Sequence, residues 1–395
     1  MDSRHYLQGL LAARSRVGPG FSAEAAQPQA GDSEGRPHTD ELLHRIDQVV
    51  QKMPGDELDN LEDFRRAYQI FLTHAEPTLR RLDTAPAAPL SVNEVLALEA
   101  VIKVDGSRPA LLIRDDTIDP EHPLATAWRD TFYSVRNSVR KRAAAVGRIG
   151  PQNQSALDYS GTGWLVDDQQ GIVLTNWHVL RDLLTRHPAA FTATATGFKI
   201  QKNAVTIDFC GESGSVVKKR FQLVEATPSG IDGKGLACLD AAVFKLGKSI
   251  DGAPLPSAIP VSADLDGPQG TMSSLCLIGF PFRPEQTSGT GNGVNWDWVT
   301  GTLFGNRFGL KRLAPGVACR PLGSITGDKQ LWVFGHDATT LGGNSGSPLL
   351  AWRDADFAGF GLHFGGRTVD TNVAHAIGQC KEPLRKIGVP VAGPR

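Results

Sequence analysis

After residue 145 the chain becomes a succession of short apolar runs separated by Gly, Pro, Asp or Asn. Runs of this length, bounded by turn-forming residues, are typical of β-strands and are too short for most helices. The pattern predicts an all-β barrel or sandwich and does not choose between the two. Neither half of the chain shows an internal repeat. The predicted strands include residues 146–149, 164–166, 172–174, 205–209, 221–224, 242–246, 275–278, 331–334 and 360–364.

The first 145 residues have a different texture. Residues 1–38 are rich in Gly, Pro, Ser, Ala and Gln, which is typical of a flexible tail or linker. Beyond them, apolar residues recur with a helical period, and Thr39 or Asp40 can cap the first helix. Ser91 and Glu94 form a capping box before a later one. The apolar stripes of the expected helices occupy residues 42–50, 58–72, 95–102 and 124–139.

These textures divide the chain into a smaller, mostly α-helical N-terminal part and a larger, mainly β part. We expect a tail at 1–38, a helical regulatory or adaptor region at 39–120 and a connecting helix at 121–145. The β domain should then occupy residues 146–388, with a short tail at 389–395. Within the helical region, residues 110–113 have the composition of a strand.

Composition limits the kinds of protein this chain can be. The formal net charge of −1 argues against a surface that binds nucleic acid over the whole protein. No CxxC pair is present, so neither a zinc site nor a disulfide framework is indicated, and buried free thiols are expected. The five cysteines are Cys210, Cys238, Cys276, Cys319 and Cys380.

The N-terminal residues give no signal for export. Residues 7–13 form a short and interrupted apolar stretch, whereas a secretory signal needs a continuous one. No run is long and apolar enough for a membrane-spanning helix. We therefore expect a cytoplasmic protein without a membrane partner.

The segment Gly342-Gly343-Asn344-Ser345-Gly346-Ser347-Pro348 places a serine in a glycine-flanked turn. A serine hydroxyl is a poor nucleophile unless a base removes its proton and the developing oxyanion is stabilised. Glycines beside it allow backbone conformations that direct amide N–H groups into one small space. Taken alone, the same string would be interpreted first as an ordinary loop.

Two further residues supply what such a serine needs. His178 lies in Thr175-Asn176-Trp177-His178-Val179 after an apolar run, and Asp240 precedes the strand predicted at 242–246. Each also has a purely structural interpretation: His178 as a histidine at a strand end, and Asp240 as a turn residue. The chain order His, Asp, Ser is that of the chymotrypsin class and differs from subtilisin and the α/β-hydrolases.

With these motifs, and with Gly161-Thr162-Gly163-Trp164 before them, the chain resembles the trypsin-like serine peptidases of the chymotrypsin fold over residues 146–388. It is most similar to their bacterial, disulfide-free branch, which includes HtrA-type and glutamyl endopeptidases. The resemblance implies two six-stranded barrels with the active site in the cleft between them. It also implies that His178 is the general base, that Asp240 orients it, and that Ser345 is the nucleophile.

The backbone N–H groups of Gly343 and Ser345 match the oxyanion hole of that family. No metal or organic cofactor is implied. In the secreted trypsins an Asp before the serine pairs with a new N-terminal amine, but this chain has Asn344 there. An amide cannot form that ion pair, so control should come from the N-terminal region or from movement of active-site loops.

The substrate pocket is predicted from two residues. Thr340 precedes Ser345 by five positions, and His363 lies on the strand expected to line the pocket. Glutamyl endopeptidases carry a Thr or Ser and a His at matching places, and a hydroxyl with an imidazole suits a carboxylate. The Gly-x-His-x-Gly-Gly string is equally compatible with a structural turn. A basic P1 residue is disfavoured because Thr339 stands where trypsins have an Asp.

The leading interpretation is an intracellular serine endopeptidase that cleaves protein or peptide substrates. A regulatory protein partner would act through residues 39–120, and proteins of similar organisation are effectors in bacterial signalling or defence systems. The alternative is a helical adaptor whose peptidase-like domain only binds peptides. Housekeeping proteolysis of HtrA type is disfavoured, because no PDZ-like segment follows residue 388.

Overall fold

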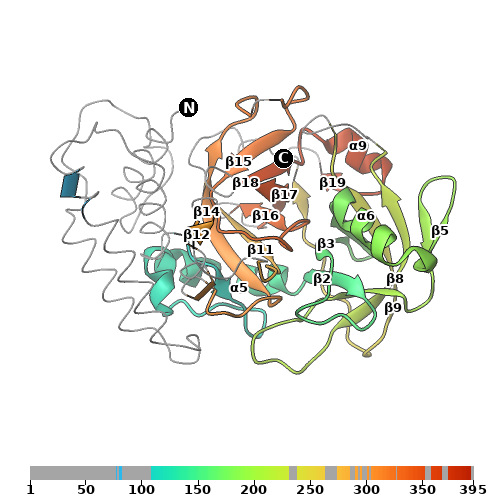
Figure 1. Cartoon of the computed structure of the whole chain (residues 1–395), viewed down its shortest axis with the longest axis horizontal. Helices are drawn as coiled ribbons and strands as arrows, with labels where there is room; N and C mark the ends of the chain where they lie inside the picture. Colours follow the sequence, from blue (N-terminus) through green and yellow to red (C-terminus); the bar gives the residue numbers. More distant parts are fainter. Residues whose placement is uncertain are drawn as a thin grey trace.

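Six strands close into a first antiparallel barrel in the computed structural model of the chain (Figure 1). The strand order is β8-β7-β2-β3-β4-β9, and β9 pairs back with β8 to complete the ring. A hairpin of β5 (Phe191–Ala193) and β6 (Phe198–Ile200) extends from β8. The six strands are β2 (Val146–Pro151), β3 (Gly161–Asp167), β4 (Ile172–Thr175), β7 (Val205–Asp208), β8 (Arg220–Pro228) and β9 (Ala242–Ser249).

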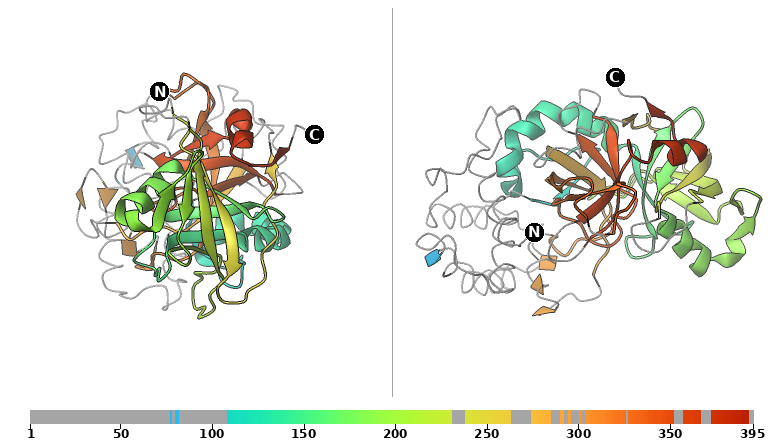
Figure 2. Two further views of the ribbon diagram at one scale, coloured as in Figure 1. Left: turned by 90° about the vertical axis from the view of Figure 1, so that its right-hand side faces the viewer. Right: turned by 90° about the horizontal axis from the view of Figure 1, so that it is seen from above.

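A second ring of six strands follows, in the order β16-β11-β14-β15-β18-β17, and β17 pairs back with β16. The two barrels lie side by side in Figure 1 and in the right-hand view of Figure 2. Two short parallel strands, β10 (Val261–Ser262) and β19 (Val391–Ala392), extend the sheet beyond β17. The ring strands are β11 (Ser274–Gly279), β14 (Arg312–Arg320), β15 (Val333–His336), β16 (Pro348–Ala351), β17 (Gly359–Gly366) and β18 (Asn372–Ala376).

The structure describes residues 77, 80, 81, 108–230, 238–262, 274–284, 290–291, 294–295, 300–301, 304–325, 327–351, 357–366 and 372–392. The helices expected between residues 39 and 107 lie outside this part of the chain, apart from three helical positions. Strands β12 (Thr290–Gly291) and β13 (Val294–Asn295) form a separate two-stranded sheet that is not hydrogen-bonded to the strands of either barrel. In the described residues, no helix has the length and apolar character needed to cross a membrane.

The double barrel confirms the predicted fold class, and each predicted run lies in or overlaps a strand. The strand-like residues 110–113 overlap β1, whereas strands β5, β6, β10, β12, β13, β14, β16, β18 and β19 were not predicted as such. In β14, a run of charged and small residues conceals the strand, although most of it is buried between β11 and β15. Pairing with neighbours on both sides decides such a segment more than its own propensity.

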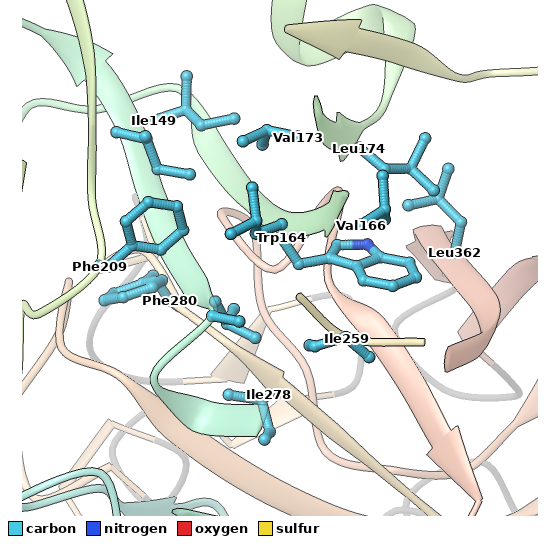
Figure 3. Packing of buried hydrophobic residues seen from close by; sticks show 14 of the residues in the cluster. Ile149, Trp164, Val166, Val173, Leu174, Phe209, Ile259, Ile278, Phe280 and Leu362 are labelled. Atoms are coloured by element: carbon cyan, nitrogen blue, oxygen red, sulfur yellow. The ribbon is translucent and has the colours of Figure 1, made fainter. Parts of the chain in front are cut away.

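Apolar side chains of both barrels meet in one continuous core around Trp164 (Figure 3). The indole is fully buried, and Figure 3 shows it beside Leu362 of the second barrel. A Cβ on Gly359 would lie 2.6 Å from the indole, so this strand of the second barrel needs a glycine there. Trp164 on β3 therefore fixes β17 against the first barrel, and both strands contact the serine turn.

The chain reaches the barrels through a short strand and a helix. Helix α5 (Arg129–Ala143) follows the 3-10 helix η2 (Pro123–Trp128), and it buries Phe132 and Val139 on one face. Asp130 lies in its first turn and basic residues lie in its last, which suits the helix dipole. The connecting helix expected at 121–145 is therefore split into two helical pieces, and α5 forms its longer part.

Two expected boundaries differ from the structure. The region expected to be a helical module ends within the barrel, because β1 (Leu111–Leu112) pairs antiparallel with β14. Ile113 is fully buried in the common core. The tail expected from residue 389 is also structured, since β19 pairs with β10 and Val389 is 2% exposed. A two-residue strand such as β19 carries too little pattern of its own to be recognised locally, and the strand-like composition of residues 110–113 did not show that β1 would join the barrel sheet.

We expect a chain that starts a few residues before Arg108 to fold, and a chain that starts at residue 143 not to fold. The second deletion removes Ile113, Phe132 and Val139, each 0% exposed. Losing a large core side chain costs about 2–5 kcal/mol, and a domain has only about 5–15 kcal/mol in total. Thermal melts followed by circular dichroism test this. A cooperative melt at an unchanged temperature in the shorter chain would contradict it.

Candidate active site

His178 lies in the first turn of α6 (Trp177–Arg186), directly after β4. The sequence interpretation of a strand end is thus replaced by a helix start, with Asn176 as the N-cap residue. The apolar residues Val179, Leu180 and Leu183 are buried on one face of this helix. That anchorage leaves the His178 side chain 32% exposed at the helix start.

Asp240 holds His178 with both carboxylate oxygens. Oδ2 lies 2.5 Å from His178 Nδ1, and Oδ1 accepts the His178 backbone N–H at 2.9 Å. The second bond satisfies one of the N–H groups that a helix start leaves without a partner. Asn176 Nδ2 donates to the Asp240 carbonyl at 2.8 Å, which fixes the backbone before β9. The carboxylate therefore fixes both the helix start and the imidazole ring.

Burial by itself would raise the pKa of Asp240, because it disfavours the charged form. The hydrogen bonds and charge of His178 outweigh it, and the pKa of Asp240 lies below its ordinary value. Asp240 is thus an anion near neutral pH. An anion at Nδ1 keeps the proton on that nitrogen and leaves Nε2 free to accept another.

The turn around Ser345 is clamped onto both barrels. Thr162 on β3 donates its N–H to the Ser345 carbonyl at 2.9 Å and its hydroxyl to the Gly343 carbonyl at 2.8 Å. On the other side, Gly346 N–H donates to the His363 carbonyl at 2.9 Å. A Cβ on Gly161 would lie 2.7 Å from Val179 Cγ2 and 3.0 Å from the Ser345 carbonyl oxygen. The residue after His178 and the serine turn therefore flank the same glycine.

Two glycines make the turn possible. Gly343 has φ +86° and Gly346 has φ +89°, in the region that residues with a Cβ rarely adopt. A Cβ on Gly346 would also clash with the Thr162 carbonyl oxygen and with the Thr175 hydroxyl. Close contact with β3 thus requires glycine here, as the motif predicts.

The N–H groups of Gly343 and Ser345 make no hydrogen bond to any residue that the structure describes. The preceding peptide is oriented by Phe282, whose N–H donates to the Gly342 carbonyl at 2.5 Å. A trans peptide points its C=O and N–H in opposite directions, so the Gly343 N–H faces away from Phe282. Neither N–H is therefore occupied by a described residue, and their role as donors to an oxyanion stays a prediction from the sequence.

The Ser345 hydroxyl likewise makes no hydrogen bond within the described part of the chain. Hydrogen bonds between catalytic groups are often long or poorly aligned until substrate is bound. Asp240 and His178 are therefore in direct contact, whereas Ser345 is placed by its backbone, whose carbonyl lies against the same glycine as Val179, the residue after His178.

His375 on β18 is a third histidine at this site, and the sequence gave no reason to select it. Its Nε2 accepts the Asp240 backbone N–H at 3.0 Å, which requires a neutral ring. Burial lowers the pKa of His375 to about 4, although the charge of Asp240 acts in the opposite direction. Phe364 stacks on the ring with centroids 4.2 Å apart. The second barrel thereby contacts the acid of the first.

His363 also has a partner that the sequence did not suggest. Its Nδ1 lies 3.1 Å from Nε2 of His336 on β15, and both rings are buried. Burial, with the charge of His178 as the next cause, lowers the pKa of His363 to about 3, although a hydrogen bond to the Val373 backbone opposes this. Burial also holds the pKa of His336 well below its ordinary value. The pair is therefore neutral near neutral pH.

The other predicted pocket residue, Thr340, is half-buried between β15 and the serine turn. Its neighbour Thr339 is 6% exposed and donates its hydroxyl to the Arg108 carbonyl at 2.7 Å. The position where trypsins have an Asp is thus bonded to the segment that precedes the barrels. Residues 231 positions apart carried no local signal of this contact.

Comparison with known proteins shows the family to which the chain belongs. Residues 161–359 match the trypsin-like peptidase domain family. A probable serine protease of Lysobacter enzymogenes is 41% identical over 348 residues, which are 87% of this chain and 88% of that protein. The chain therefore belongs to the trypsin-like serine peptidases. All five cysteines lie in the described part and carry free thiols.

Two solved structures are more distant. The Rv3671c protease from M. tuberculosis, in its active form, is 19% identical with a TM-score of 0.33. That match covers 65% of this chain and 86% of that one. Neuropsin, a serine protease expressed in mouse brain, is 12% identical with a TM-score of 0.40 and covers 62% of this chain and 95% of its own. The family assignment rests on the domain match and on the bacterial relative.

Proposed function

We propose that this chain is an endopeptidase that hydrolyses protein peptide bonds through Ser345, His178 and Asp240. The observation that carries the proposal is the double contact of the Asp240 carboxylate with His178, beside a serine turn clamped to both barrels. An isolated serine in a loop would have no base. A peptide-binding domain would have no need for an oriented imidazole and two unpaired amide donors.

The reaction uses the chain's own groups. As the Ser345 Oγ attacks the scissile carbonyl, His178 Nε2 takes its proton, and Asp240 stabilises the imidazolium that forms. The N–H groups of Gly343 and Ser345 donate to the oxyanion. His178 then returns the proton to the leaving amine, and water hydrolyses the acyl-enzyme on Ser345 by the reverse sequence.

A fluorophosphonate probe tests this proposal, because it reacts with an activated serine and needs no known substrate. Mass spectrometry should locate the adduct on Ser345. The alternative, an adaptor that only binds peptides, predicts a chain that binds peptides but is not labelled. Absence of labelling in a folded, full-length protein would therefore exclude the peptidase proposal.

We further propose that the substrate residue on the acyl side of the scissile bond is a Glu, or failing that an Asp, held by Thr340 and His363. If His336 Nε2–H donates to His363 Nδ1, the proton of His363 lies on Nε2, and a substrate carboxylate would take this neutral donor over from the Val373 backbone. The His336 pairing supports this arrangement. Burying a carboxylate without such donors would cost several kcal/mol.

The pH dependence follows from the pKa of His363, which lies at about 3. Because the ring is neutral above that pH, kcat/KM for Glu substrates relative to Gln substrates should not change between about pH 5 and 9 through His363. A carboxylate bound through an imidazolium would instead lose preference as the pH rises. Peptide libraries varied at P1 and assayed across this range distinguish the two.

His363→Ala should lower kcat/KM for Glu substrates about a hundredfold, and that for small apolar P1 residues far less, because an unpaired buried carboxylate costs roughly 2–3 kcal/mol. Thr340→Val is the companion variant, with a smaller loss from one hydroxyl. A preference for Leu, Phe or Arg, or an unchanged profile in His363→Ala, would show that His363 is a structural residue of β17, the strand that replaces the turn considered from the sequence.

Regulation and cellular location are further parts of the proposal. Asn344 is 3% exposed, and its Oδ1 would lie 2.5 Å from a Cβ on Gly279, so its amide is directed at the end of β11. This placement supports control by something other than a freed N-terminal amine. We propose that the residues before Arg108 regulate an intracellular enzyme. A role in bacterial signalling or defence would be tested by cleavage profiles of cells that express wild type or Ser345→Ala.

A further inference from the structure

The loop between β15 and β16 is held by two separate sets of contacts. Its second half, residues 342–346, is bonded to Thr162, Phe282 and His363, as described above. Its first half, residues 337–340, has other partners. The Ala338 carbonyl accepts from Asn372 Nδ2 at 2.7 Å, and Thr339 donates to Arg108. The half that carries the nucleophile and the half next to the predicted pocket are thus anchored independently.

Arg108 makes two contacts with the first half. Its guanidinium Nη2 lies 2.6 Å from Asp337 Oδ2, and its carbonyl accepts the Thr339 hydroxyl at 2.7 Å. The ion pair is buried, because the Arg108 side chain is 9% exposed and the Asp337 side chain is 4% exposed. Asp337 Oδ1 accepts the Val317 N–H on β14 at 2.7 Å. In sequence, Asp337 is the one charged residue between 337 and 346.

The segment that carries Arg108 is itself fixed to the second barrel. Strand β1, which begins three residues after Arg108, pairs with β14. The Arg312 guanidinium donates to the Ala110 carbonyl. The Arg108 guanidinium also lies over Trp128, 5.9 Å from its ring centroid. The contacts of Arg108 are therefore made from a rigid support, and a rigid support is what gives a binding pocket a defined shape.

From this geometry we infer that Arg108, Asp337 and Thr339 are positioning residues for the substrate pocket. They hold residues 337–340 in the conformation that receives the P1 side chain, so that the segment preceding the barrels sets selectivity. The inference rests on the proposed function, which places P1 beside Thr340. Residues 1–107 are joined to the enzyme at this point, so a partner bound to them would act on the pocket before it acts on the nucleophile.

The test uses the full-length chain and two readouts. Labelling of Ser345 by a small fluorophosphonate needs the nucleophile and oxyanion donors, whereas kcat/KM for a peptide panel varied at P1 also needs the pocket. Thr339→Val removes one hydroxyl and keeps the side-chain shape. It should lower kcat/KM for the preferred P1 residue about fivefold, since a hydrogen bond contributes about 1 kcal/mol. The labelling rate should stay within about threefold, the range left by small indirect effects.

Arg108→Ala should lower kcat/KM for the preferred P1 residue about a hundredfold, because it leaves Asp337 buried and unpaired. Arg108→Lys keeps the charge and should restore part of the loss. The matched control is Arg220→Ala, which breaks the Arg220–Asp251 pair of 2.8 Å in the first barrel and should leave the P1 profile unchanged. If Arg108→Ala does not fold, Thr339→Val and Arg108→Lys decide.

Reduced turnover with preserved labelling, and a flattened P1 profile, supports the inference. Equal loss of labelling and turnover overturns it, because the variants would then act on the nucleophile turn or on the whole fold. Unchanged kcat/KM and P1 profile in Thr339→Val and Arg108→Lys also overturn it. If wild type itself is not labelled, the peptidase proposal has failed, and that result is distinct from these.

Discussion

Ser345→Ala should reduce kcat for peptide hydrolysis by roughly a millionfold, the scale seen when a triad serine is removed. The residual rate would come from binding and the oxyanion donors. The substitution should leave the melting temperature almost unchanged, because the Ser345 hydroxyl makes no hydrogen bond within the described residues. The turn is held by backbone groups and glycines, all of which remain. Peptide turnover and a thermal melt on the same preparation measure both effects.

The matched control is Ser134→Ala, which removes an exposed hydroxyl bonded to the Thr131 carbonyl on α5 and should leave turnover unchanged. His178→Ala should lose nearly as much activity as Ser345→Ala. The double variant should lose little more than either, because triad members act as a unit. Full activity in Ser345→Ala, or additive losses in the double variant, would contradict the assignment of these residues to one nucleophilic unit.

Asp240→Asn should lower kcat by about ten thousandfold, the effect of placing His in the wrong tautomer. The reason lies in the double contact. Asp240 uses one oxygen for His178 Nδ1 and the other for the His178 N–H. Asparagine has only one oxygen, so its NH₂ must face either Nδ1 or a backbone donor. If the NH₂ faces Nδ1, the proton of His178 must move to Nε2, which is the wrong tautomer for a base. If the NH₂ faces the His178 backbone N–H, two hydrogen-bond donors are placed against each other.

Kinetics at saturating substrate, with a circular dichroism melt, checks this prediction. Asp251→Asn is the control, because it removes a carboxylate from an ion pair of the first barrel away from the site. It should leave kcat unchanged. A loss below about tenfold in Asp240→Asn would mean that a productive tautomer of His178 is retained. Asp240 would then only accept the N–H at the start of helix α6 and would not orient the base.

His178, Asp240 and the Gly343–Ser345 turn could be selected from the sequence, because each carries a local signature. The glycines that the turn requires, the strand that precedes His178 and the strand that follows Asp240 are properties of a few neighbouring residues. The alternation of short apolar runs with turn residues likewise indicated an all-β domain, either a barrel or a sandwich. The choice of two barrels, and the grouping of the candidate nucleophile, base and acid into one site, came from the resemblance to a peptidase family.

Other partners of the site had no such signature. His375 lies 135 residues from Asp240, and Arg108 lies 229 residues from Asp337. His336 and His363 become a neutral pair only because both are buried against each other. Desolvation and contact geometry depend on which strands become neighbours, and a single position in the sequence does not record that.

The sequence by itself therefore determined an all-β domain and the candidate His, Asp and Ser, and the double barrel and their proposed roles followed from the family that these motifs resemble. Only the tertiary structure decided what supports them. Closing the second ring brings His375 of β18 into contact with Asp240. The pairing of β1 with β14 brings Arg108 into contact with the loop between β15 and β16. The physical reason is that catalytic groups must be of particular chemical types, which sequence shows, whereas their support needs only atoms at the right distance, which packing supplies.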